Sequence, residues 1–189
     1  MICDICKRKN TSSCPIDCLT NPKINIGSGG MLKQEYINFD LLVWKYHYLE
    51  TDIIGDIKKI TEILPLDYFQ EIICFHTIEH FRKHESINVL EDFYKLLIRG
   101  GRLILEAPDI LGSYDYFVTR KKSPSAYIDM IFSTEAVMKK HGKGFLHRSG
   151  WTRDIAAETM QKIGFKITQK GIGLSHGMGP RDFRVEGIK

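Results

Sequence analysis

The stretch Lys23-Ile24-Asn25-Ile26-Gly27-Ser28-Gly29-Gly30 runs from an apolar strand pattern into a glycine turn. It is followed by Tyr36-Ile37-Asn38-Phe39-Asp40, a second strand pattern that ends in an acid. Glycine allows a backbone to take positive φ and to approach a ligand closely. An acid at the end of the next strand can accept hydrogen bonds from ribose hydroxyls at the top of a parallel sheet. Because glycine also occurs in ordinary turns, the rest of the chain decides whether this turn holds a nucleoside.

Short apolar runs recur along the chain and indicate strands. The runs at 70–76 and 102–107 are the most apolar, which is typical of strands buried on both faces of a parallel sheet. Strands are predicted at 23–27, 35–40, 51–57, 70–76, 102–107, 165–170 and 181–187.

Helical patterns separate several of these runs. One helix is predicted to begin at a Ser86 cap and to end at Gly100-Gly101. A second is predicted to begin at a Thr152 cap and to end at Gly164, and a weaker one lies within 58–64. Apolar residues recur at three- and four-residue spacing in the first two helices, as expected of helices that cover a sheet. Strands that alternate with helices predict an α/β fold with a parallel sheet.

The two last strands have a short connection, residues 171–180, which is rich in glycine and contains a proline. A parallel crossover needs a dozen or more residues, so these two strands are predicted to be antiparallel. The expected fold is therefore a Rossmann-like, doubly wound, mostly parallel sheet with an antiparallel hairpin at its C-terminal end.

Length and composition indicate a single globular core. The 189 residues suit one domain, and a formal net charge of +4 is too mild to require nucleic acid as a partner. No stretch approaches the roughly 20 apolar residues that span a bilayer, so no membrane partner is expected. The polar, cysteine-bearing start is unlike a signal peptide, and the cytoplasm is the expected location.

Four of the five cysteines lie in the first eighteen residues, and they form two closely spaced pairs. Four thiolates can hold a structural zinc ion tetrahedrally, leaving no position open for substrate. Free thiols, disulfides and an iron–sulfur cluster remain as alternatives. Residues 1–22 are thus a cysteine-rich arm, a candidate zinc knuckle, before a domain over 23–189. The candidate ligands are Cys3, Cys6, Cys14 and Cys18. The fifth, Cys74, is predicted to be a small buried apolar residue.

Residues 108–150 fit no strand–helix unit and form a long insertion rich in aromatic residues. Insertions of this length in compact domains are commonly functional. We expect this one to be a lid over a substrate, with Tyr114, Tyr116 and His147 as contacts. The same aromatic residues would equally serve to fill a core.

Five features occur in a fixed order along residues 23–189. They are the glycine turn at 27–30, Asp40, Gly55-Asp56-Ile57, Phe75-His76-Thr77-Ile78-Glu79-His80, and Leu97–Leu105 with its two glycines. As a set they resemble the class I S-adenosylmethionine-dependent methyltransferases. The chain looks most like a small group of predicted methyltransferases from bacteria and phages, in which the end of strand four reads His-x-x-Glu-His. The terminal stretch 181–189 is also similar to that group.

The resemblance implies a role for each residue at these strand ends. The methionine portion of the cofactor would lie against Gly27, Ser28, Gly29 and Gly30, and its ribose would bind Asp40. The adenine would contact Asp56 and Ile57. The sulfonium side would be lined by Phe75 and His76. The sequence departs from the common pattern in three ways. Asn25 stands where the family usually has an acid, and the usual third glycine is displaced, which gives Gly-x-Gly-Gly at 27–30. The ten residues between Gly29 and Asp40 leave no room for a full helix.

The function implied by this resemblance is methyl transfer from S-adenosylmethionine to an oxygen or nitrogen acceptor on a small molecule, sugar or protein. A histidine is a suitable base near neutral pH. His76 is the first candidate and His80 the second, with Glu79 and His147 after them. The end of strand four lacks the Asn/Asp-Pro-Pro-aromatic run, and the catalytic region lacks a Pro-Cys nucleophile, so methylation of DNA bases is not expected.

Other functions remain open at this point. The irregular glycine turn favours a non-catalytic binding module with a structural zinc arm as the alternative. A nicotinamide dehydrogenase would need a third glycine that opens a full helix, and transfer of an aminopropyl group would need an acidic cluster in the insertion. The sequence leaves the acceptor and the oligomeric state undetermined.

Overall fold

The fold is built on a seven-stranded sheet with the order β5-β2-β1-β6-β7-β9-β8. Its strands are β1 (Lys23–Ile26), β2 (Ile37–Asp40), β5 (Ile53–Ile54), β6 (Phe69–Phe75), β7 (Leu97–Pro108), β8 (Lys166–Ile172) and β9 (Asp182–Ile188). A small hairpin, β3 (Lys45–Tyr46) and β4 (Leu49–Glu50), stands apart from the sheet. The computed structural model describes residues 22–133, 139, 146–177 and 179–189. The four N-terminal cysteines lie outside these residues.

The strand directions confirm the predicted topology. The pairs β1–β2, β1–β6, β2–β5 and β6–β7 are parallel. The pairs β7–β9 and β8–β9 are antiparallel, as the short connection between the last two strands predicts. From β1 the chain moves outward to β2 and β5, then returns to place β6 on the other side of β1. The strand order therefore reverses between β1 and β6, and the carboxyl ends of such strands are where α/β proteins bind ligands.

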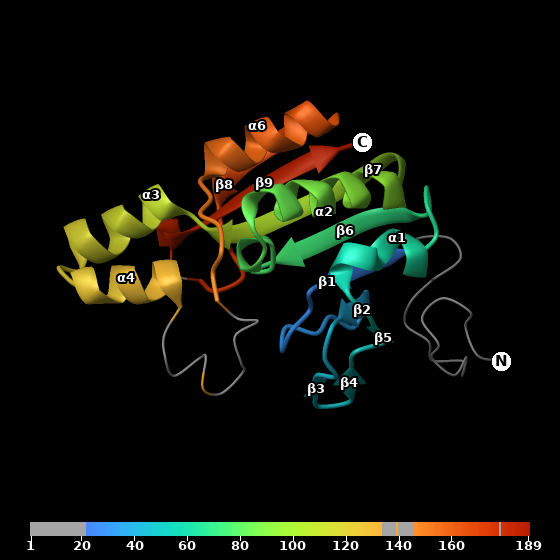
Figure 1. Ribbon diagram of the computed structural model, residues 1–189, viewed down its shortest axis with the longest axis horizontal. Helices are drawn as coiled ribbons and strands as arrows, with labels where there is room; N and C mark the ends of the chain where they lie inside the picture. The colour runs from blue at the N-terminus through green and yellow to red at the C-terminus, as the bar shows by residue number, and fades with distance from the viewer. Residues whose placement is uncertain (1–21, 134–138, 140–145, 178) are drawn as a thin grey trace.

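Three helices cover one face of the sheet. They are α1 (Ile60–Ile63), α2 (Lys83–Leu96) and α6 (Arg153–Ile163), which lie side by side in front of the strands in Figure 1. Short helices η1 (Ile57–Lys59) and η2 (Ile78–His80) follow β5 and β6. The inward faces of helices and strands form one apolar core that includes Ile24, Ile26, Phe39, Ile72, Cys74, Val89, Phe93, Met160 and Val185. Cys74 is fully buried, as predicted. Among the described residues no helix combines the length and apolar character needed to cross a membrane.

The opposite face of β6, β7 and β9 carries a row of charged residues. Arg102 bonds Glu71 through Nε at 2.8 Å and lies 3.4 Å from Glu186. Arg184 bonds Glu186 through Nε and Glu106 through Nη1, each at 2.7 Å. Because side chains alternate along a strand, these charged residues share their face with the buried Ile73 and Ile104, while the other face is apolar. The apolar runs at 70–76 and 102–107 therefore do form buried strands, and ion pairs lie on one of their two faces.

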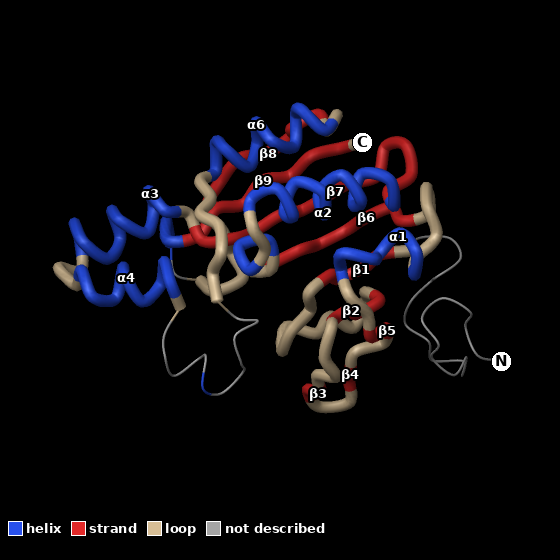
Figure 2. Tube along the Cα trace, in the orientation of Figure 1, coloured by secondary structure: helices blue, strands red, loops and turns tan. Residues whose placement is uncertain are grey.

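Two asparagines take the place of a helix between β1 and β2, where Figure 2 shows only loop. Asn25 Nδ2 donates to Met31 O at 2.9 Å and to Asn38 Oδ1 at 3.1 Å. Asn38 in turn accepts from Lys33 N and donates to Lys33 O. Both side chains are buried. The connection is short, as its ten residues predict, and it is held by amide hydrogen bonds.

The boundaries of the longest helix differ from those predicted. Helix α2 begins after Arg82, whose backbone N–H donates to the side chain of Glu85 at 2.9 Å. Ser86 is inside the helix and buried, and its hydroxyl donates to Ile78 O. The helix ends at Leu96 because fully buried Leu97 takes an extended backbone and begins β7. The pair Gly100-Gly101 therefore bends the start of a strand and does not end the helix.

Three further expectations on the elements are answered by the structure. The weak helix within 58–64 is present as η1 and α1. The strand predicted at 51–57 is reduced to Ile53–Ile54. The insertion contains α3 (Ile110–Ser113), the π-helix η3 (Tyr114–Arg120) and α4 (Pro124–Phe132), which project beyond the end of β7 in Figure 1.

Candidate functional site

A cavity of about 700 Å³ lies at the carboxyl ends of β1, β2 and β6. Its volume is in the range of pockets that bind drug-sized ligands. The predicted site residues that line it are Gly27, Ser28, Gly29, Gly30, Asp40, Ile57, Phe75, His76 and His80. Most of the residues expected from the sequence are thus brought to one cavity, at the reversal of strand order.

The glycine turn is held close to the end of β6. Gly27 has a φ of +67°, and a Cβ at this position would lie 2.2 Å from Thr77 Oγ1. The N–H groups of Gly27 and Ser28 both donate to Phe39 O, at 2.9 and 3.1 Å. Position 27 therefore requires glycine for its backbone conformation and for its contact with Thr77.

Asp40 connects the end of β2 to the glycine turn. Its Oδ2 accepts from Gly29 N at 2.8 Å and its Oδ1 accepts from Leu42 N at 3.0 Å. A carboxylate has about four lone-pair sites, so two remain for further donors. Asp40 is partly exposed at the cavity, and it can accept from ligand hydroxyls while it holds the turn.

Asp56 and Ile57 lie differently with respect to the cavity. Ile57 is a lining residue and is largely buried. Asp56 is not among the lining residues; its carboxylate accepts from Lys58 N at 2.9 Å and caps η1. The structure thus gives Asp56 the role of a helix cap.

Several lining residues escaped the sequence analysis. Leu41 and Leu42 follow Asp40 directly and are 62% and 47% exposed, and both line the cavity. Met31, Trp44 and Phe81 add apolar surface. The signal in the sequence is an apolar run after the acid that is not followed by a strand able to bury it. These side chains give the cavity an apolar wall suited to an aromatic ring.

The residues present fit S-adenosylmethionine. Asp40 can take ribose hydroxyls, and Ile57 and Leu42 can pack against adenine. The Oγ of Ser28 is buried and has no hydrogen-bond partner within the part of the chain that the structure describes. A buried hydroxyl without a partner is costly. A polar group of a ligand at the glycine turn would satisfy it.

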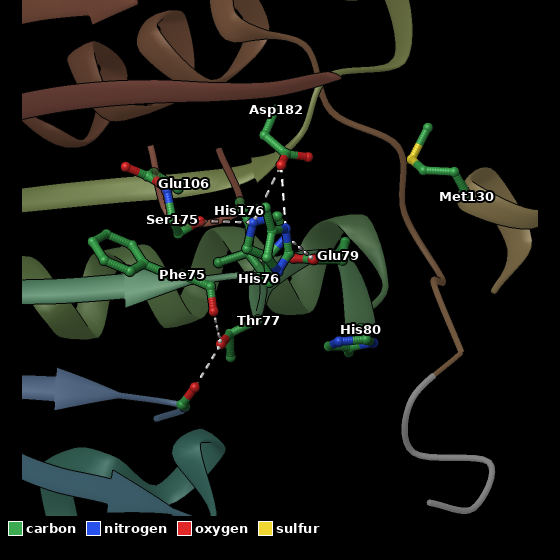
Figure 3. A network of polar contacts seen from close by, with 12 residues as sticks. Phe75, His76, Thr77, Glu79, His80, Glu106, Met130, Ser175, His176 and Asp182 are labelled. Atoms are coloured by element: carbon green, nitrogen blue, oxygen red, sulfur yellow. Dashed lines mark hydrogen bonds and ion pairs between the residues drawn. The ribbon is translucent and has the colours of Figure 1, made fainter. Parts of the chain in front are cut away.

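His76 is held between two carboxylates at the end of β6, as Figure 3 shows. Its Nδ1 is 3.5 Å from Glu79, and its Nε2 is 3.7 Å from Asp182 and 3.1 Å from the hydroxyl of Ser175. The ring of His176 lies 3.9 Å from it, centroid to centroid. Burial alone would lower the pKa of His76, but the adjacent Glu79 and Asp182 raise it. His76 also has a φ of +50°, a strained conformation for a residue other than glycine.

A second group of titratable side chains adjoins His76. Glu79, His80 and His147 each offer one ligand atom, and these atoms lie within 4.8 Å of one another. The rings of His80 and His147 are 5.2 Å apart. Burial lowers the pKa of His147, whereas the three surrounding histidines hold the pKa of Glu79 below its usual range despite its burial. Glu79 therefore carries a negative charge among imidazoles.

The insertion contributes one wall of the cavity. Phe117, Met130 and Asp129 line it, together with Ala126 and Ser133. Tyr114 and Tyr116 are not among the lining residues; they pack edge-on against Tyr127 and Phe117. His147 does line the cavity. Of the three contacts expected from the insertion, the structure places only His147 at the site.

A smaller cavity of about 190 Å³ adjoins the first. Glu79, Met130 and His147 line both cavities, as does Pro108. Trp151, Ile110 and Phe132 close the smaller one on its other sides. The two cavities thus meet at Glu79 and His147.

Comparisons with known proteins agree on the fold. No protein-family model matches the chain, and no curated protein matches it. Among solved structures, a S-adenosylmethionine-dependent methyltransferase from Archaeoglobus fulgidus aligns with a TM-score of 0.60 and 11% identity, covering 91% of this chain and 87% of that one. Another, from Mesorhizobium loti, aligns with a TM-score of 0.60 and 11% identity, covering 89% and 90%. The chain therefore has the fold of the class I S-adenosylmethionine-dependent methyltransferases.

Proposed function

We propose that the protein binds S-adenosylmethionine in the larger cavity and transfers its methyl group to an oxygen or nitrogen acceptor. The observation that carries this proposal is the convergence of the glycine turn and Asp40 on one cavity at the reversal of strand order. The likeness in fold to methyltransferases supports it.

When bound, the cofactor supplies a methyl group on a positively charged sulfur. The protein contributes position, because displacement at a methyl carbon requires the acceptor in line with the bond that breaks. In such a transfer the acceptor's lone pair would form the new bond to carbon while the electrons of the carbon–sulfur bond went to sulfur, and a base of this chain would take the acceptor's proton. His80 and His76 are the proposed bases. His76, between Glu79 and Asp182, has both ring nitrogens near carboxylates, so it also positions Glu79.

The smaller cavity is the proposed place of the acceptor. It opens beside Glu79 and His147, next to the wall that Phe75 and His76 form in the larger cavity. Its volume of about 190 Å³ suits a small molecule or one side group of a larger one. Residues 108–150 are the proposed lid, since their helices contribute lining to both cavities.

The test of cofactor binding is calorimetry with S-adenosylmethionine and with its demethylated product. Asp40→Ala is expected to weaken both affinities about 10- to 100-fold, because a hydrogen bond to a charged group contributes about 1.5 to 3 kcal/mol. Asp154→Ala is the matched control: this aspartate is on α6, 62% exposed and paired with Lys170. The Asp154→Ala variant should bind both compounds with the affinity of the wild type.

Two results would contradict the proposal in different ways. If neither compound binds at millimolar concentration, the cavity is not a cofactor site. If both compounds bind but no acceptor from a broad panel of alcohols, phenols and amines is methylated, the protein is better described as a non-catalytic binding module. Equal binding by wild type and Asp40→Ala, with the variant folded, would remove Asp40 from the site.

Structural zinc on the arm remains a separate proposal. Its ligands would be Cys3, Cys6, Cys14 and Cys18, which lie outside the described residues. Closely spaced cysteine pairs support it. Metal analysis of the purified protein should find about one zinc per chain, and replacing all four cysteines with serine should remove it. Zinc retained after that replacement would assign the ion to another site.

A further inference from the structure

Three side chains from two distant parts of the chain meet where the two cavities join. Glu79 and His80 belong to η2 after β6, and His147 follows the insertion. One carboxylate oxygen and one nitrogen from each imidazole lie within 4.8 Å of one another. Two imidazoles and a carboxylate are a ligand set that transition metals accept, with further positions left for water or substrate.

Glu79 carries the strongest indication of a missing partner. Its side chain is 3% exposed, and its Oε1 is 3.5 Å from His76 Nδ1. Its Oε2 is buried and has no hydrogen-bond partner within the described parts of the chain. An ionised oxygen buried without a partner is costly, so such an atom calls for an explanation. A cation on the side that faces the two histidines would provide one.

Both histidines are oriented by backbone carbonyls. His80 Nδ1 is 3.3 Å from Leu146 O, and His147 is hydrogen-bonded to the backbone of Met130. Histidines that bind metals commonly donate their other ring nitrogen in this way, which fixes the tautomer and the ring orientation. The hydrogen bonds here have that arrangement.

The main chain of Glu79 also holds the segment that carries His147. Arg148 N and Ser149 N both donate to Glu79 O, at 2.7 and 3.2 Å. Residue 79 thus offers a carboxylate through its side chain and fixes the neighbouring histidine through its carbonyl. Such a doubly anchored position gives the three ligand atoms a defined geometry.

A neighbouring cluster of similar composition is less suited to a metal. His76, His176 and Asp182 also gather their ligand atoms within 4.8 Å. Asp182, however, accepts from the guanidinium of Arg181 at 2.9 Å, and it faces both histidine rings. An adjacent fixed cation and satisfied oxygens oppose metal binding there. In Figure 3 Glu79 lies between this cluster and His80.

We propose that Glu79, His80 and His147 bind one divalent transition-metal ion, with Mn²⁺ among the ions accepted. The metal would lie where the cavities meet, because Glu79 and His147 line both. Its remaining positions would hold an oxygen of the acceptor, such as a hydroxyl. This second statement rests on the proposed methyl transfer, whereas metal binding itself does not. With the metal bound, His76 would be the base, because His80 would have one ring nitrogen on the metal and the other beside Leu146 O.

The test uses the full chain and Mn²⁺ alone, without S-adenosylmethionine. Free Mn²⁺ is followed by electron paramagnetic resonance during a titration. About one Mn²⁺ per chain is expected to bind. Mn²⁺ is chosen because it favours oxygen and nitrogen ligands over the thiolates of the N-terminal arm. Glu79→Gln and His147→Asn are each expected to weaken binding at least tenfold. Glu79→Gln leaves the carbonyl that anchors Arg148 and Ser149 in place.

His84→Asn is the matched control, since this exposed histidine on α2 is outside the cluster. It should bind Mn²⁺ like the wild type. Circular dichroism confirms that each variant is folded. Absence of Mn²⁺ binding at millimolar concentration, or unchanged binding in both folded variants, would overturn the proposal.

The position of the metal has its own readout. With Mn²⁺ loaded, the proton resonance of the S-methyl group of bound S-adenosylmethionine should broaden in the wild type. It should not broaden in Glu79→Gln under the same conditions. Bound Mn²⁺ without broadening, while calorimetry shows the cofactor bound, would remove the metal from the acceptor site. Failure of cofactor binding with Mn²⁺ still bound would instead contradict the proposed function alone.

Discussion

Arg184→Met should lower the free energy of unfolding by about 3 kcal/mol, because it leaves a buried carboxylate without its counter-charge. Glu106 is fully buried and accepts from Arg184 Nη1 at 2.7 Å, from Ser175 N at 2.9 Å and from Leu174 N at 3.1 Å. The two backbone donors to Glu106 remain in the variant. The expected loss of stability is therefore at the lower end of the range of about 3 to 5 kcal/mol for a broken buried ion pair. Urea denaturation at pH 7 measures it.

The loss should also depend on pH. Burial alone would raise the pKa of Glu106, but hydrogen bonds from Ser175 and Arg184 lower it below its ordinary value of 4.5. A lowered pKa contributes stability above the unfolded value, and this contribution is lost as the pH falls. Without Arg184 the pKa of Glu106 rises, so the difference in stability between variant and wild type should shrink as the pH falls from the raised pKa of the variant through the lowered pKa of the wild type.

Arg153→Met provides the control, because Arg153 is an exposed residue whose Nε is 4.0 Å from Asp154. Its effect should stay within about 0.5 kcal/mol. If Arg184→Met and Arg153→Met cost the same at pH 7, the row of ion pairs on the sheet contributes no more than a surface charge does.

Gly27→Ala should cost about 3 kcal/mol and should also abolish cofactor binding. The new Cβ would lie 2.2 Å from Thr77 Oγ1, and the φ of +67° is unfavourable for alanine. A left-handed backbone costs a residue with a Cβ roughly 1 to 2 kcal/mol, and forcing extra volume into a packed contact costs about 1 to 3 kcal/mol. Thermal unfolding and calorimetry with S-adenosylmethionine measure the two effects.

Gly29→Ala separates the backbone cost from the clash. Gly29 has a φ of +49°, but a Cβ there would meet no atom within 4 Å. This variant should therefore lose only about 1 to 2 kcal/mol. A loss in Gly27→Ala no greater than that in Gly29→Ala would mean that Thr77 moves aside at little cost.

The sequence predicts the sheet well because each of its signals is local. Apolar runs mark the strands, and the short connection at 171–180 predicts the antiparallel pairing of β8 and β9. The glycine turn and Asp40 reach one cavity because parallel strands end at the same edge of the sheet. These inferences need only the period of a strand and the length of a connection.

The remaining features depend on contacts between distant residues. His147 is 68 residues from Glu79, and it is brought there by a carbonyl that no pattern reveals. Ser86 has the composition of a helix cap, yet it is buried and bonds Ile78 O, since the turn after β6 needs that donor. Helix α2 ends before Gly100-Gly101 because burial of Leu97 outweighs local propensity. Tertiary packing decides each of these cases.

The amide pair between β1 and β2 has a consequence for any comparison with relatives. An aspartate at position 25, as the methyltransferase pattern has it, could not donate to Met31 O, and it would face the Oδ1 of Asn38 as a second acceptor. A change toward the common pattern would therefore break the loop unless position 38 also gained a donor on that side. Residues 25 and 38 should therefore co-vary among relatives. Asn25 replaces the usual acid because, together with Asn38, it holds the loop that stands in place of a helix.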